Sequence, residues 1–138
     1  MKGVYVLAIS INGPLRLNIG SLGLVRFETG TYAYVGSAQN NLEKRVARHL
    51  KKDKPGFWHI DYLLESHSAN IASVFVKNAS REEECAIAKR LGDFGKEIEG
   101  FGCSDCRCSS HLFMISECGF LSEFMDGVSL PLFKEVQN

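Results

Sequence analysis

Runs of apolar residues divide the chain into short predicted strands. Residues 3–11 (GVYVLAISI) are rich in β-branched and aromatic side chains and end at an Asn-Gly-Pro turn, which predicts a strand. Residues 32–36 (YAYVG) and 71–76 (IASVFV) predict two more, and we expect 71–76 to be central in the sheet. Residues 15–19 and 24–27 predict further short strands between glycines that turn the chain.

Apolar residues at helical spacing predict the helices. The first covers residues 40–53, with Asn40 as N-cap and an acidic residue three positions later as its capping-box partner. A short second helix is predicted over 58–65. The third runs over 80–99, with Ser80 as N-cap of a second capping box and glycines after its last turn.

The last part of the chain continues this mixed pattern. Residues 111–116 predict a last strand and 120–125 a last helical turn, and no repeat or long linker divides the chain. We therefore predict one domain over residues 1–138 of α/β (α+β) class, with a small, mainly antiparallel central sheet flanked by helices. Residues 1–100 are its motif-bearing core, and 101–138 a Cys/His-containing segment packed on the same domain.

Composition argues against a membrane protein. The hydrophobic fraction of 45% and the charged fraction of 23% are ordinary for a soluble globular protein. No apolar run approaches the roughly 18 residues of a membrane span. The apolar start of the chain lacks a cleavage-type ending and is interpreted as a strand instead of a signal peptide, so a cytoplasmic protein is expected.

The distribution of charge is more informative than its total, which is zero. Between residues 40 and 56 the chain is strongly basic, and after residue 111 it is mostly acidic. A basic patch on a neutral protein suits the phosphates of nucleic acid, whereas the alternative is an ordinary solvated helix face. The basic residues of the segment are Lys44, Arg45, Arg48, Lys51, Lys52 and Lys54.

Two pairs of residues share a face of their predicted element. Tyr32 and Tyr34 point to one side of a strand with which the strand of Tyr5 can pair. Strand tyrosines usually serve packing. Arg45 and His49 lie four residues apart at the edge of a helix's apolar stripe. A half-buried arginine there suits either an anion such as phosphate or a carboxylate partner.

Glu84 interrupts an otherwise apolar helix face. With a helical period, Glu84 begins a row that continues through Ile87, Ala88 and Leu91. Glu83 completes the cap and favours the positive end of the helix, but Glu84 has no such role. A carboxylate directed toward the core needs a cation, either a basic side chain or a metal ion.

The order of these motifs resembles the GIY-YIG nuclease superfamily. Residues 3–5 read GVY, residues 34–36 read YVG, and the following helix reads LEKRVARHL over 42–50. Residues 58–64 (WHIDYLL), the pair Glu84-Cys85 and the segment 104–113 (SDCRCSSHLF) are similar to an uncharacterised prokaryotic branch of that superfamily.

The resemblance implies roles for the matching residues. Tyr5 and Tyr34 would be hydroxyls that activate the nucleophile and position the phosphate, with Tyr5 as the base that deprotonates water. Arg45 would neutralise charge on the phosphate, and His49 would contact the phosphate or a tyrosine. Glu84 would hold one Mg²⁺ or Mn²⁺ ion. Because the pKa of tyrosine is about 10, the base role requires the metal and Arg45 to lower it.

Two departures from the superfamily pattern carry expectations of their own. The segment of residues 6–33 between the two tyrosine motifs is longer than usual, which predicts an enlarged hairpin that shapes or obstructs the substrate groove. The late Asn of many members is missing, and its polar role either passes to the Cys/His segment or is lost.

A C-x2-C-x-C-x2-H run lies near the end of the chain. Its four ligands could hold a zinc ion, or the loop could line the active site through Asp105 and a histidine, or its thiols could simply be buried. Two further cysteines, Cys85 and Cys118, are expected in the core. The run consists of Cys103, Cys106, Cys108 and His111.

Three classes of function follow from these observations. The leading one is a metal-dependent endonuclease acting on nucleic acid, on DNA before RNA, in repair or on particular DNA structures. The others are a catalytically lapsed nucleic-acid-binding module and a zinc-stabilised protein-interaction domain. A neutral protein with one basic patch is also expected to gain affinity as a homo-oligomer or with a partner protein. Expected nucleic-acid contacts are Lys44, Arg48, Lys51, Lys52 and Trp58, the last by stacking on a base if it is not core.

Overall fold

The computed structural model of the chain describes residues 1–103 and 107–135. The strands are β1 (Gly3–Ile11), β2 (Leu15–Asn18), β3 (Leu24–Phe27), β4 (Gly30–Ala38), β5 (Ala69–Lys77), β6 (Gly95–Glu97), β7 (Leu112–Ile115) and β8 (Asp126–Val128). The helices are α1 (Leu42–Leu50), α2 (His59–Leu64), α3 (Glu82–Phe94) and α4 (Leu130–Glu135), with 3₁₀ turns η1 (Gly20–Leu22) and η2 (Gly119–Glu123). The predicted α+β class is confirmed.

An antiparallel six-stranded sheet in the order β6-β7-β4-β1-β5-β8 forms the centre of the molecule, and β2 and β3 pair separately. β1 lies between β4 and β5, so the predicted pairing of the tyrosine strands is confirmed. The register places Tyr5 opposite Gly36 and Leu7 opposite Tyr34. Successive residues of β1 point to opposite faces and nearly all are buried, because helices cover both sides.

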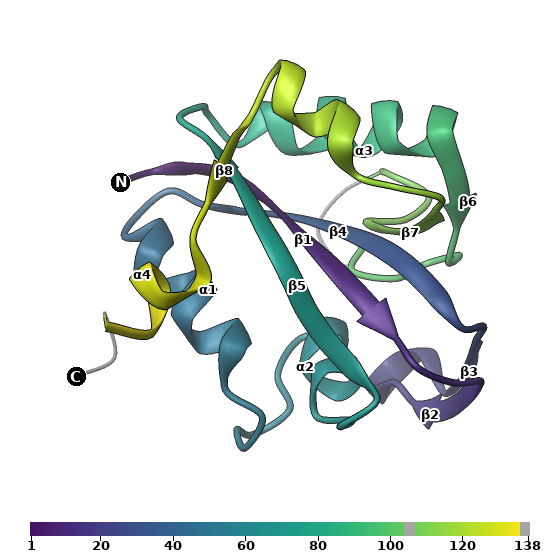
Figure 1. The fold of residues 1–138 in the computed structure, drawn as a ribbon. Coiled ribbons are helices and arrows are strands. Elements are labelled where there is room, and N and C mark those ends of the chain that lie inside the picture. The colour runs from purple at the N-terminus through teal and green to yellow at the C-terminus, as the bar shows by residue number, and fades with distance from the viewer. Residues whose placement is uncertain (104–106, 136–138) are drawn as a thin grey trace.

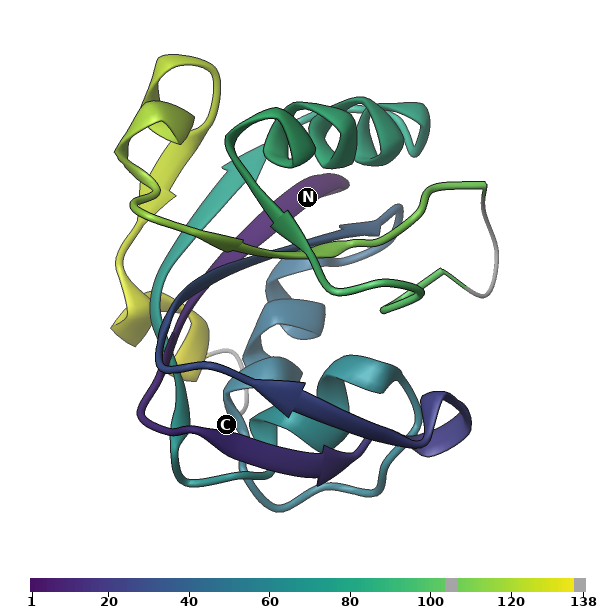
Figure 2. The same ribbon diagram turned by 90° about the vertical axis from the view of Figure 1, so that its right-hand side faces the viewer.

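The two faces of the sheet carry separate cores. Figure 1 shows α3 along one side of the strands and α1, α2 and α4 along the other, and Figure 2 shows the same layers from the side. Val4 and Val6 point toward α3 and pack with the predicted apolar row of that helix. Tyr5 and Leu7 point the other way, into a core shared with α1 and α2. Alternation along β1 therefore places Tyr5 on the α1 side.

The helix predicted over residues 80–99 is shorter than expected. It begins at Glu82 and ends at Phe94, and Gly95 starts β6, which pairs with β7. A side chain at Gly95 would collide with the backbone of Met114 and the side chain of Ile115. The glycine therefore permits a close strand pair, and this tertiary contact ends the helix earlier than the apolar period indicates.

The other boundaries also shift. Asn41, not Asn40, caps α1: its side chain accepts a hydrogen bond from the amide of Lys44 at 3.0 Å, and its φ of 52° is one that Asn tolerates. Glu43 forms no capping box but pairs with the N-terminal amine at 3.1 Å. The predicted strand 111–116 appears as β7, yet β8 and α4 still follow it.

The enlarged segment between the tyrosine motifs forms the predicted hairpin, β2 and β3 joined through η1. The longest helix described, α3, has 13 residues, far short of the roughly 20 that cross a bilayer. None of the helices within residues 1–103 and 107–135 has the length and apolar character of a membrane span.

Candidate active site

A cavity of about 620 Å³ lies beside the end of β4. β7 pairs with β4 only as far as Tyr34, so the last residues of β4 pair with β1 alone among the described strands. At this free edge the two faces of the sheet meet, and side chains from both reach the same space. The cavity is lined by Tyr5, Tyr34, Ser37, Arg45, Trp58 and Glu84, among others.

Tyr5 and His49 form a buried pair at the base of the cavity. The Tyr5 hydroxyl lies 2.8 Å from His49 Nε2, and both side chains are 2% exposed. Burial raises the pKa of Tyr5 above its ordinary value, and the nearby Arg45 charge only partly opposes this. Burial also lowers the pKa of His49 to about 3, so its ring is neutral at physiological pH. The expected lowering of the Tyr5 pKa is therefore not found in the protein alone.

The glycine of the YVG motif makes room for Tyr5. The ring of Tyr5 lies across Gly36, its neighbour in the register, and a Cβ there would stand 2.5 Å from the Tyr5 hydroxyl. Gly3 has a similar role, because a side chain would collide with the carbonyl of Lys77 in β5. Both motif glycines are explained by close approach within the sheet.

Arg45 projects from α1 into the cavity wall. Its guanidinium donates a hydrogen bond from Nη1 to the carbonyl of Ser37 at 3.2 Å and lies 4.6 Å from the centre of the Trp58 ring. No carboxylate in the described part of the chain forms an ion pair with it. The carboxylate-paired alternative for Arg45 is therefore not observed, and its charge faces the cavity.

Glu84 reaches the cavity from the first turn of α3. Its Oε1 accepts a hydrogen bond from the Ser37 hydroxyl at 2.8 Å, and its Oε2 lies 2.9 Å from His111 Nδ1. Burial acts to raise the pKa of Glu84, but the hydrogen bonds from His111 and Ser37 outweigh it and hold the pKa below the ordinary value. The carboxylate is therefore ionised and has hydrogen-bonding partners, as we expected for a glutamate that interrupts an apolar helix face.

Trp58 and Arg48 belong to the supporting structure of the site. Arg48 makes two hydrogen bonds with the buried carboxylate of Asp61, at 2.8 and 3.0 Å, and its guanidinium also lies 4.6 Å from the Trp58 ring centre. Burial acts to raise the pKa of Asp61, yet the bonds from Arg48 and from the amides of Trp58 and Phe57 lower it. Trp58 is half-buried and lies against two guanidinium groups.

His59 lies two residues before Asp61 but bonds to other segments of the chain. Its Nδ1 accepts a hydrogen bond from the amide of Gly102 at 2.9 Å, and its Nε2 lies 3.0 Å from the Ser21 hydroxyl. Because Nδ1 is the acceptor, Nε2 carries the proton and donates to Ser21. His59 thus connects the η1 hairpin to the chain before β7, and both segments line the cavity.

The predicted nucleic-acid contacts do not all face the cavity. Lys44 and Lys51 are exposed on and just after α1, whereas the Lys52 ammonium donates to the carbonyls of Ser66 and Ala69. Only Trp58 of the predicted contact set lines the cavity.

Of the Cys/His run, the structure describes Cys103, Cys108 and His111. Cys103 donates a hydrogen bond to the Phe101 carbonyl, and Cys106, like Asp105, lies outside the described residues. Cys108 and His111 instead lie close to Cys85. Cys85, expected in the core, is exposed, because it points away from the apolar row of α3, whereas Cys118 is buried as expected.

Several residues of the site escaped the sequence analysis. Ser37 and Arg81 line the cavity, as do Tyr62, packed against Gly20 and Gly56, and Phe57, whose side chain is 76% exposed at the rim. The adjacent aromatic pair Phe57-Trp58 was a signal for Phe57 that the sequence did offer. The contact of Ser37 with Glu84 joins residues that are 47 apart in the sequence, and no local sequence pattern indicated it.

The comparison with known protein families identifies the chain's relatives. A family model described as "Domain of unknown function DUF123" matches residues 4–129, a span that includes every cavity-lining residue. The chain belongs to this family. No curated protein and no solved structure matches the chain. The family description names no activity, so the function of this DUF123 domain has to be inferred from its cavity.

Proposed function

We propose that the chain is a metal-dependent endonuclease that hydrolyses phosphodiester bonds in nucleic acid, with DNA preferred over RNA. One observation carries the proposal: Tyr5, Tyr34, Arg45 and Glu84 come from four separate elements and line one cavity. These residues supply hydroxyls, a cation and an anion, the groups that phosphodiester hydrolysis requires. They are also the residues on which the resemblance to GIY-YIG nucleases rests.

The donor set at Glu84 fits a hard divalent cation. Mg²⁺ and Mn²⁺ are commonly held by one or two carboxylates together with water and substrate phosphate. Glu84 is ionised, borders the cavity and is fixed by Ser37 and His111, and each of its oxygens retains a lone pair beyond the hydrogen bond it accepts. Such an ion would polarise a phosphoryl oxygen and stabilise the leaving group.

Water activation falls to the Tyr5–His49 pair. A free Tyr5 phenolate is disfavoured because burial raises the pKa of that hydroxyl. The hydrogen bond with His49 offers another route: Tyr5 takes a proton from water while passing its own to His49 Nε2, which requires the pKa of His49 to rise from about 3 when substrate is bound. A bound phosphodiester places negative charge in the cavity, which raises the pKa of His49 and favours this transfer.

Substrate charge is balanced by Arg45 and by the basic helix. The Arg45 guanidinium has donors suited to two phosphate oxygens, and its contact with Trp58 limits its movement. Tyr34, also at the cavity wall, would position the phosphate through its hydroxyl. The exposed ammonium groups of Lys44 and Lys51 supply sequence-independent attraction for the backbone of nucleic acid.

Phe57 is the side chain best placed to stack on a base. Trp58 lies against the guanidiniums of Arg45 and Arg48, whereas Phe57 projects its ring into solvent at the rim and meets Trp58 edge-on, with ring centres 5.2 Å apart. Stacking on an aromatic ring tolerates any base. This favours recognition of nucleic-acid structure over sequence.

The proposal is tested by cleavage of labelled single-stranded, duplex, nicked and branched DNA and RNA. We expect the wild type to cut at least one substrate with Mg²⁺ or Mn²⁺ and none with a chelator. Arg45→Ala should abolish cleavage, whereas Arg90→Ala should not, because Arg90 lies on the ring of Phe124 away from the cavity. If no substrate is cut but nucleic acid binds in a salt-dependent way, the domain is a binding module and the nuclease proposal is wrong.

A further inference from the structure

A second group of chemically related side chains lies behind the Glu84 wall of the cavity. Cys85, Cys108 and His111 each offer a ligand atom, and these three atoms lie within 4.8 Å of one another. Cys85 belongs to the first turn of α3, whereas the other two lie in the chain that enters β7. Two segments distant in sequence therefore meet through soft ligands.

The chemistry of this group differs from that of Glu84. Thiolate sulfur and imidazole nitrogen favour Zn²⁺, whereas carboxylate and water favour Mg²⁺ or Mn²⁺. Tetrahedral zinc with bonds of about 2.0–2.3 Å places its ligand atoms about 3.3–3.8 Å apart. Closing the observed separations requires movements of about 1 Å, within reach of rotation of the exposed Cys85 side chain.

Glu84 supplies the outer contact that zinc-bound histidines usually have. A ligating histidine typically donates its second ring N–H to a carboxylate, which fixes its tautomer and orientation. His111 Nδ1 lies 2.9 Å from Glu84 Oε2 in just this relation, so a metal would be bound through Nε2. Glu84 and Cys85 are adjacent on α3, so one helical turn would support both sites.

We propose that Cys85, Cys108 and His111 bind a zinc ion that fastens the start of α3 to the chain entering β7. These three ligands, all from described residues, leave a fourth position of a tetrahedral site to be filled. This ligand set differs from the run read from the sequence, because it includes Cys85 and excludes Cys103, whose thiol donates to the Phe101 carbonyl. The site does not depend on the proposed nuclease activity.

Cobalt titration of the reduced, metal-free full chain tests the site, since Co²⁺ bound to thiolates in tetrahedral geometry has intense visible and charge-transfer absorption. We expect one equivalent to bind and Zn²⁺ to displace it. Loss of an outer-shell partner alone weakens metal binding about 10–100-fold, so Cys85→Ser should weaken it at least about a hundredfold. Cys103→Ser is the matched control and should bind as the wild type does.

Three results would overturn the proposal. One is the absence of thiolate-to-cobalt absorption in the wild type. Another is a loss of affinity in Cys103→Ser while Cys85→Ser binds normally, which would assign the metal to the run instead. The third is rapid formation of a Cys85–Cys108 disulfide that Zn²⁺ does not prevent, detected by mass and identifying a redox pair. Circular dichroism and thermal unfolding show whether each variant folds. Zn²⁺ should raise the midpoint of thermal unfolding only in proteins that retain Cys85.

Discussion

The two walls of the cavity are built in opposite ways. Apart from the charged Arg45, the wall formed by β1, β4 and α1 is dry: Tyr5 and His49 are buried, neutral and paired with each other. The wall formed by α3 and the chain before β7 is polar: Glu84 is ionised and flanked by a hydroxyl, an imidazole and thiols. In the proposed mechanism, the pair that would move protons is thus kept apart from the carboxylate that would hold a cation, although both face one space.

The free end of β4 makes this arrangement possible. Because β7 stops pairing at Tyr34, Ser37 can bridge the two walls, accepting from Arg45 through its carbonyl and donating to Glu84 through its hydroxyl. A fully paired β4 would separate the Tyr5 side from the Glu84 side. The site thus depends on an incomplete sheet edge.

The polar wall is expected to show the largest effect. Glu84→Gln keeps the shape of the side chain and removes its charge, so it should lower metal-dependent cleavage about a hundredfold to a thousandfold, as loss of one electrostatic contact in a site usually does. Initial rates at saturating Mg²⁺ and Mn²⁺ measure this. Glu83→Gln, whose carboxylate pairs with Lys77 on the surface, is the control and should cleave normally. Cleavage within about tenfold of the wild type in Glu84→Gln would show that the carboxylate is not needed.

The sequence predicted the strands and helices that form both walls, but not the contacts that join the two walls. The strand and helix periods placed Tyr5 beside Tyr34 and directed Glu84 inward, because these depend on local alternation. The contacts of Glu84 with Ser37 and His111 join residues 47 and 27 apart, through a loop and a strand end that carry no periodicity. Gly95 shows the same limit, since its strand pairing overrides the helical pattern.

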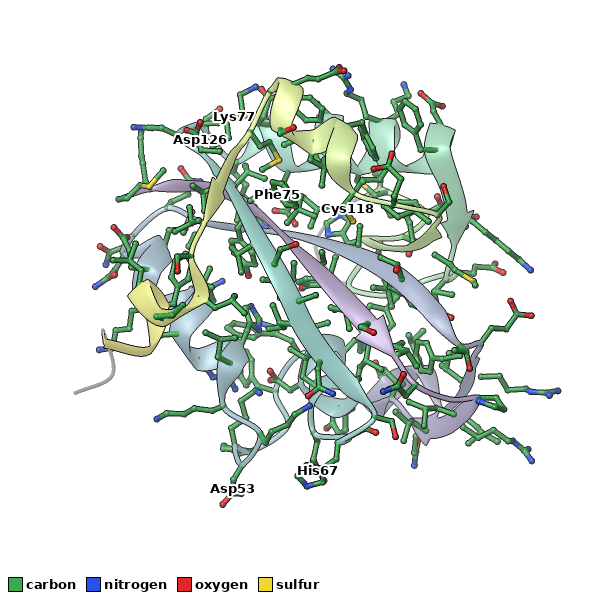
Figure 3. All side chains as sticks on the ribbon, viewed as in Figure 1. Asp53, His67, Phe75, Lys77, Cys118 and Asp126 are labelled. Atoms are coloured by element: carbon green, nitrogen blue, oxygen red, sulfur yellow. The ribbon has the colours of Figure 1, made fainter. Side chains whose placement is uncertain are left out.

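The second largest expected effect is the loss of stability when Asp61, which supports the dry wall, is changed. Asp61→Asn removes a buried charge that Arg48 and two backbone amides satisfy, so the free energy of unfolding should fall by about 2–3 kcal/mol. Half-exposed Arg48 can be rehydrated, which keeps the loss below that of a fully buried pair. Urea denaturation measures the change. Asp53→Asn, an exposed change that Figure 3 places at the molecular edge, should cost less than about 0.5 kcal/mol.

Gly36→Ala tests whether close packing positions Tyr5. The added methyl would stand 2.5 Å from the Tyr5 hydroxyl, so either the ring or the strand must move, at a cost of about 1–3 kcal/mol. Cleavage should fall as well, because the Tyr5–His49 bond is displaced. Gly127→Ala, where the nearest neighbour of an added Cβ is the Phe75 ring at 3.9 Å, should change neither property. Normal stability and activity in Gly36→Ala would mean that Tyr5 is not held by this contact.

The remaining effect, which near neutral pH is small, is a dependence of stability on pH that originates in the dry wall. The pKa of His49 is about 3 in the folded protein, against about 6.5 unfolded, because burial disfavours the charged ring. As the pH falls, His49 is therefore protonated in the unfolded state before it is protonated in the folded protein. This contribution to stability is complete above about pH 6.5 and is lost as pH falls toward about 3, by at most about 1.4 kcal/mol per pH unit.

His49→Gln isolates that contribution. Glutamine retains a group that can bond to the Tyr5 hydroxyl but does not titrate, so the variant should be less stable than the wild type at about pH 7 and lose less stability on acidification to about pH 5. Urea denaturation at both values gives the two slopes. Glu84 titrates in the same direction in both proteins, because its pKa is also lowered, so it cancels in the comparison. Equal slopes would mean that His49 reaches solvent and that the wall is not dry.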